Sequence, residues 1–69
     1  MILKWENEFS IRVTIRDGEA VISGNKAGLL SLAGHLTALA QEPSGCHIHL
    51  DEYNSLEDGS AELIIERLE

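Results

Sequence analysis

The feature that most constrains the fold is a strict alternation of apolar and polar residues from Phe9 to Arg16. A period of two is typical of a β-strand with one buried face. Asp17-Gly18 follows at once, and this dipeptide suits a two-residue type I′ turn. The chain is therefore predicted to reverse into a second strand over residues 19–23. The turn then sets Val13 opposite Ile22 on the buried face of a hairpin.

A helix is predicted from Lys26 to about Gln41, after Gly24 ends the second strand. Asn25 is a suitable N-cap, because its side-chain oxygen can accept hydrogen bonds from the free amides of the first turn. Pro43 lies just beyond the predicted end of the helix. Residues that share one apolar stripe are assigned to the core: Leu29, Leu32, Ala33, Leu36, Leu39 and Ala40.

Two more strands are predicted after the helix. Residues 46–51 alternate again, and residues 61–68 resume the pattern after a polar loop over residues 52–60. This order of elements predicts a single α+β domain over residues 1–69, a four-stranded antiparallel sheet with one helix on one face. The spatial orders 2-1-3-4 and 1-2-4-3 are both available. The first is preferred, because a right-handed crossover places the third strand beside the first.

Size and charge limit what such a protein can do. A chain of 69 residues with an aliphatic core, and with Cys46 as its only cysteine, is expected to be marginally stable unless a partner adds to it. Its net charge of −7 argues against binding nucleic acid and favours a basic partner. Residues 42–69 carry this charge, with eight acids and only Arg67 as a base. Neither a signal peptide nor a membrane-spanning apolar run is evident, so a cytoplasmic protein is predicted.

The predicted helix has a second face that is small and uncharged. No charged residue lies between Lys26 and Gln41, whereas a solvated helix normally carries several. Small residues allow close approach, so this face is predicted to pack against a second copy or another protein. A poorly optimised but exposed helix is the alternative. The predicted dimer-interface residues are Ala27, Leu30, Ser31, Gly34 and Ala38.

Two imidazoles and a carboxylate share one face of the third predicted strand: His47, His49 and Asp51. They spread over about 13 Å, so two of them could reach one zinc ion while a third ligand would come from another strand, such as Glu62 or Glu66. Metal binding is therefore a weaker hypothesis. No catalytic residue and no cofactor are predicted, because one small sheet with one helix offers little concavity.

The polar loop after the third strand gathers acids around a single tyrosine. It does not match a calcium-binding EF-hand loop, because Tyr53 stands where an oxygen ligand is needed. Instead, the acids would steer a basic partner toward the loop and Tyr53 would anchor it. A solvated acidic turn is the alternative. The predicted partner-binding residues are Asp51, Glu52, Tyr53, Glu57 and Asp58.

The stretch His47-Ile48-His49-Leu50-Asp51-Glu52-Tyr53, with residues 62–66 after it, resembles the immunity protein 32 family, which comprises predicted immunity proteins of bacterial polymorphic toxin systems. The resemblance runs from about Val21 to the C-terminus and includes the helix rich in leucine and alanine. It implies a protein without catalytic activity that binds and neutralises a toxin encoded nearby. An acidic surface is compatible with a basic toxin such as a nuclease.

Three functions remain open from the sequence. The first is an immunity-like module that covers a toxin with its acidic C-terminal half. The second is a homodimeric housekeeping or regulatory protein whose helix face forms the dimer. The third is a histidine-based metal-binding protein. The first is preferred, and it does not exclude a homodimer, because the acidic residues and the uncharged helix face are different parts of the chain.

Overall fold

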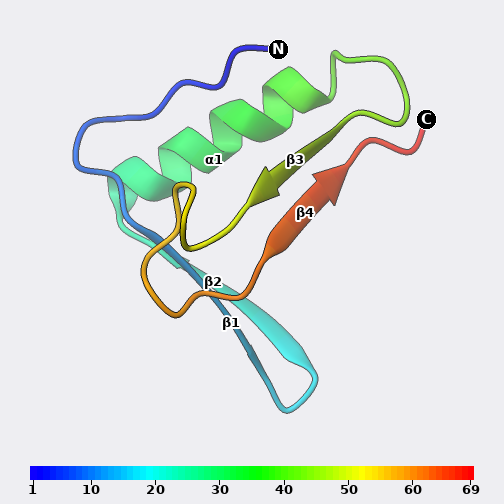
Figure 1. Cartoon of the computed structure of the whole chain (residues 1–69). Helices are drawn as coiled ribbons and strands as arrows, with labels where there is room; N and C mark the ends of the chain where they lie inside the picture. The colour runs from blue at the N-terminus through cyan, green and yellow to red at the C-terminus, as the bar shows by residue number, and fades with distance from the viewer.

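The computed structural model describes residues 1–69 and contains one helix and four strands (Figure 1). In chain order these are β1 (Ile11–Arg16), β2 (Glu19–Gly24), α1 (Lys26–Leu39), β3 (His47–Leu50) and β4 (Leu63–Glu66). The α+β class and the order of the elements confirm the prediction. The helix and the last two strands are shorter than predicted, by one or more residues at their ends.

Strands β1 and β2 form the predicted hairpin, with Val13 opposite Ile22. The turn residues Asp17 and Gly18 have φ angles of 52° and 78°, and a type I′ turn requires positive values at both positions. Helix α1 follows directly and is capped as predicted. The Asn25 side-chain oxygen accepts hydrogen bonds from the Gly28 amide at 2.7 Å and from the Ser10 amide at 3.0 Å. This cap therefore joins the start of the helix to the start of β1.

The predicted four-stranded sheet of order 2-1-3-4 is wrong, because β1 pairs only with β2 and β3 only with β4, in two separate antiparallel sheets. The edge of β1 that was expected to receive β3 is occupied by residues 57–61. The Glu57 amide donates to the Ile11 carbonyl at 2.9 Å, and the Ala61 amide donates to the Val13 carbonyl at 2.8 Å. This segment then continues into β4. Strands β1 and β3 therefore do not pair with each other.

The buried side of α1 also differs from the prediction. Leu32 and Leu39 are buried as expected, but Leu29 and Leu36 are 50% and 45% exposed. Gly28, Ser31 and His35 are buried instead, so the buried side of the helix is rotated away from the predicted stripe. The cause is the N-terminal segment, residues 1–10, which runs along the helix (Figure 1, blue) and covers these positions.

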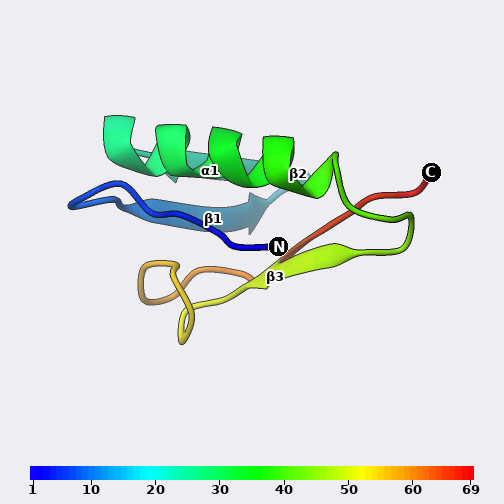
Figure 2. The same cartoon turned by 90° about the horizontal axis from the view of Figure 1, so that it is seen from above.

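The core is small and aliphatic, as the composition predicted. Helix α1 and strand β3 lie on opposite sides of the view in Figure 2, with β1 between them. The fully buried apolar side chains come from these elements and from the loop before β4: Ile11, Val13, Leu32, Leu39, Ile48, Leu50 and Leu56. Because only 10 of the 69 residues are buried, many large apolar side chains remain at the surface.

Candidate functional site

The candidate site is the acidic loop, residues 51–59, between β3 and the segment that joins β1. One apolar side chain anchors it, since Leu56 is 5% exposed and belongs to the core. The main chain continues this attachment, because the Glu57 amide donates to Ile11 of β1. The loop is therefore fixed to the body of the protein near its middle, although most of its residues are polar.

Hydrogen bonds within the loop use two of the predicted partner-binding carboxylates. Asp51 accepts at its Oδ1 from the Tyr53 amide at 2.9 Å, which is an Asx turn. Glu52 accepts at its Oε2 from the Gly59 amide at 2.7 Å and so joins the two ends of the loop. Asn54 adds a bond from its side-chain amide to the His49 carbonyl at 3.1 Å. Asp51 and Glu52 thus hold the shape of the loop.

The other three predicted residues point into solvent. Tyr53 is 91% exposed, more than any other large apolar or aromatic side chain of the protein. Glu57 and Asp58 are exposed as well. Arg12 of β1 reaches the loop, but its guanidinium donates to the Asp58 carbonyl at 3.0 Å rather than to a carboxylate. The loop therefore presents one aromatic ring and two carboxylates that make no ion pair in the structure.

The histidines of the weaker metal hypothesis lie on β3. His49 lies between two carboxylates, with its Nε2 at 3.3 Å from Glu62 Oε2 and at 3.8 Å from Asp51 Oδ2. His47 is exposed and lies opposite Glu66 in the β3–β4 register. No three side chains of His, Cys, Asp or Glu form a group that could hold a metal ion. The arrangement around His49 instead provides an ion pair when the imidazole is protonated.

The predicted dimer-interface residues fall into two groups. Leu30 and Gly34 are exposed, and Ala27 and Ala38 are partly exposed. Ser31 is 2% exposed, and its hydroxyl accepts a hydrogen bond from the Glu6 amide at 2.8 Å. Ser31 is therefore covered by the protein's own N-terminal segment and is closed to a partner.

Sequence reasoning missed the aromatic cluster that holds the N-terminal segment on α1. Trp5 packs against Phe9 with ring centroids 4.5 Å apart and meets His35 edge to face at 4.2 Å. His35 is 1% exposed, and its Nε2 donates to the Lys4 carbonyl at 2.9 Å. The sequence signal was the pair of aromatic residues Trp5 and Phe9, but the alternation from Phe9 onward assigned Phe9 to the first strand and Trp5 to no element.

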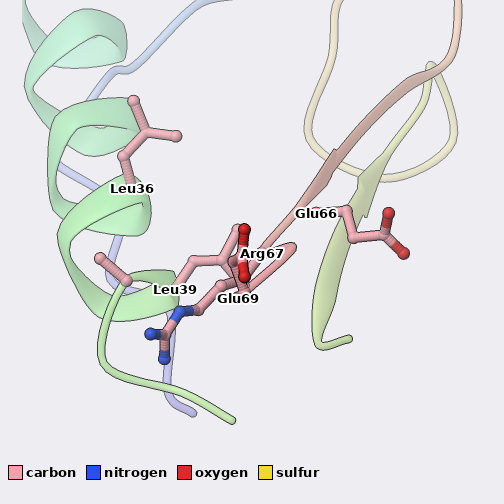
Figure 3. A pocket seen from close by; sticks show the side chains of 6 residues that line it. Leu36, Leu39, Glu66, Arg67 and Glu69 are labelled. Carbon is pink, nitrogen blue, oxygen red and sulfur yellow. The ribbon is translucent and has the colours of Figure 1, made fainter. Parts of the chain in front are cut away.

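One open pocket of about 300 Å³ lies at the C-terminal end of α1 (Figure 3). Leu36 and Leu39 line one wall, and Arg67 and Glu69 line the other. The Arg67 guanidinium points toward the end of the helix and donates to the Glu42 carbonyl, whereas the Glu66 carboxylate points away (Figure 3). Arg67 is thus used by the fold, and the pocket offers no free set of convergent polar groups.

A family model described as Immunity protein 32 matches residues 19–68, from the start of β2 to two residues beyond the end of β4. The match includes the whole acidic loop and covers more than half of the chain. The protein belongs to the immunity protein 32 family. Membership indicates a role in binding and neutralising a protein toxin, and immunity proteins are generally not enzymes.

The family match leaves out β1 and the N-terminal segment, so the cover over α1 is described by the structure alone. No curated protein and no solved structure matches this family member. Its helix is too short and too weakly apolar to cross a membrane.

Proposed function

We propose that this member of the immunity protein 32 family acts in the cytoplasm by binding a toxin with its acidic loop, and that the toxin surface it covers is basic. The family supplies the class of partner. The observation that carries the proposal is Tyr53, an aromatic side chain that is 91% exposed on a loop whose main chain is held in place.

A loop that is already ordered loses less conformational entropy on binding than a flexible one. Asp51 and Glu52 supply this order by bonding to loop amides, and Leu56 supplies it by insertion in the core. Tyrosine combines a large apolar ring with a hydroxyl group, and such residues often dominate interface energetics. Tyr53 is therefore the proposed anchor, and it would enter a pocket on the toxin.

The exposed carboxylates have a different proposed role. Glu57 and Asp58 are exposed on the same loop as Tyr53 and make no ion pair within the chain. Carboxylates at the rim of an interface mainly accelerate the encounter with a basic partner, and salt weakens their effect. Binding should therefore slow as salt rises, with a smaller change in the dissociation rate.

The first experiment is co-expression of the protein with the toxin encoded next to its gene. The wild-type protein should restore growth of the host, and Tyr53→Ala should weaken the measured Kd by about 30-fold, equivalent to about 2 kcal/mol. Leu68→Ala is the control, because Leu68 is also a highly exposed apolar residue but lies outside the loop. Equal affinity of Tyr53→Ala and wild type would exclude the loop as the contact surface.

The second experiment tests the charges. The double variant Glu57→Lys/Asp58→Lys should reduce the association rate most strongly at low salt. The variant Glu6→Lys/Glu8→Lys changes the net charge by the same amount on the exposed N-terminal segment and should have a much smaller effect. If both double variants slow association equally, net charge alone drives the encounter and the loop has no special role.

A further inference from the structure

Strand β2 has a free edge. In an antiparallel hairpin with a two-residue turn, hydrogen-bonded pairs alternate with non-bonded pairs, starting with the bonded pair that flanks the turn. The register pairs Arg16 with Glu19, so the main-chain groups of Ala20 and Ile22 point away from β1. On β1 the corresponding outer groups are used, because residues 57–61 bond to them. No strand occupies the outer edge of β2.

This edge lacks the usual protection against pairing. Natural sheets blunt free edges with prolines, bulges, inward-pointing charges or a covering loop. Strand β2 reads Glu-Ala-Val-Ile-Ser-Gly, with a charge only at its first residue and no proline. It is also regularly paired along its whole length with β1. A regular edge that is charged only at its first residue is suited to accept another strand.

An apolar surface adjoins the edge. Ile15 and Ile22 lie on the same face of the hairpin as the buried Val13, yet they are 66% and 42% exposed. Gly24 belongs to this face too, and a Cβ atom there would lie 3.2 Å from the Leu29 side chain of α1. The apolar surface therefore continues from the hairpin onto the helix. We name it the bare face, and its residues are Ile15, Ala20, Ile22, Leu29, Ala33 and Leu36.

Charges border this surface at its ends, and Glu66, Arg67 and Glu69 line a pocket with Leu36 near the C-terminal end of the helix. Asp17 and Glu19 lie at the hairpin turn, and Lys26 begins the helix at the other end of β2. If a second β2 aligns antiparallel with its Ile22 region at a two-fold axis, the acidic turn of each copy lies beside Lys26 of the other. The edge is thus complementary to itself in charge as well as in hydrogen bonding.

We propose that the bare face binds a second copy of this chain through antiparallel pairing of the two β2 strands. A two-fold axis perpendicular to the sheet places both helices on the same side, so Leu29 and the apolar residues beside it pack across the axis. The same few contacts are then made twice. Pairing joins the two hairpins into one four-stranded sheet. It also buries the exposed apolar residues of the bare face, which adds to the small core of each copy.

A second copy fits this surface better than the toxin does. The acidic loop lies on the side of β1 opposite β2, because residues 57–61 bond to the outer edge of β1. Pairing through β2 therefore leaves both acidic loops free. The proposal does not depend on the toxin-binding proposal, since it uses different residues and is measured on the purified protein alone.

Sedimentation equilibrium over a range of protein concentrations tests the proposal. The wild-type protein should show a reversible monomer–dimer equilibrium, and Ile22→Lys should weaken the dimer more than about a hundredfold, because an unpaired charge would be buried at the axis. Ile64→Lys is the control, since Ile64 is a similarly exposed isoleucine on β4 of the other sheet. Far-ultraviolet circular dichroism of both variants verifies that they fold.

A charge exchange provides a second readout that does not rely on an apolar substitution. Lys26→Glu should weaken the dimer about two- to fivefold, the range of exposed ion pairs. Adding Asp17→Lys and Glu19→Lys to the same chain should restore it. A wild-type protein that stays monomeric at every concentration overturns the proposal, as does a dimer that Ile64→Lys weakens but Ile22→Lys does not. Toxin binding that is lost only in Ile22→Lys would assign the bare face to the toxin.

Discussion

The two long sides of helix α1 differ in what covers them. One side, with Gly28, Ser31 and His35, is fully covered by the N-terminal segment and the start of β1. The other side, with Leu29 and Leu36, is about half exposed. The covered side buries Leu32 and Leu39 but also the polar Ser31 and His35, although hydrophobicity alone would bury Leu29 and Leu36 before these polar residues.

Specific hydrogen bonds explain this reversal. Two polar groups of the covered side are matched by main-chain groups of the N-terminal segment, the Ser31 hydroxyl by the Glu6 amide and His35 Nε2 by the Lys4 carbonyl, whereas His35 Nδ1 is buried without a hydrogen-bond partner. These two bonds offset the desolvation penalty of the Ser31 hydroxyl and of His35 Nε2. The leucines remain available for association. The helix thus buries Leu32 and Leu39 together with Ser31 and His35, and its exposed side carries Leu29 and Leu36.

The largest expected difference between the two sides of the helix is in the free energy of unfolding, and Trp5 on the covered side should show it. Trp5→Ala removes the ring that packs on Phe9 and His35, and it should lower the free energy of unfolding by about 3 kcal/mol. Leu36→Ala, on the other side, should cost less than about 1 kcal/mol in the monomer, because the side chain is already about half exposed. Urea unfolding at low protein concentration measures both. Similar losses in the two variants would show that the sides are equally important for the fold.

A pair of glycines offers an intermediate test with opposite signs. A Cβ atom on Gly28 would overlap the Ser10 carbonyl oxygen, whereas a Cβ atom on Gly34 meets nothing within 4 Å. Gly28→Ala should therefore destabilise the protein by about 2 kcal/mol, since the helix must shift from β1. Gly34→Ala should stabilise it by about 1 kcal/mol through helix propensity. The thermal unfolding temperature should fall in Gly28→Ala and rise in Gly34→Ala. A rise of that temperature in both variants would contradict the close packing at Gly28.

The elements predicted from the sequence are those that local chemistry determines. The alternation before Asp17-Gly18 predicted the hairpin and its register, and Asn25 predicted the start of the helix. The sheet order failed because main-chain amides of residues 57–61 occupy the edge of β1, and main-chain bonds of this kind leave no side-chain pattern. The helix face failed for a related reason, since the N-terminal segment that covers it has no periodicity.

The sequence predicted which residues belong to the candidate site, but not which of them hold the loop in shape and which are exposed. The sequence identified five residues of the acidic loop, and the family match includes all of them. It gave no means of separating Asp51 and Glu52, which bond to loop amides, from the exposed Tyr53. That separation depends on how the loop folds back on itself around Leu56. The toxin-binding role of these residues remains a prediction.

The smallest expected effect compares two hydroxyl groups of α1, one on each side. The Ser31 hydroxyl donates to the Ala27 carbonyl and accepts from the Glu6 amide, so Ser31→Ala leaves that amide without its partner and should cost about 1 kcal/mol. The Thr37 hydroxyl only donates to the Ala33 carbonyl within the helix and is exposed. Thr37→Ala should therefore be neutral or slightly stabilising, because alanine is the better helix former. Amide hydrogen exchange adds a local readout: Ser31→Ala should accelerate exchange at Glu6 while Thr37→Ala leaves it unchanged. Unchanged exchange in Ser31→Ala would mean that the aromatic cluster alone holds the segment on the helix.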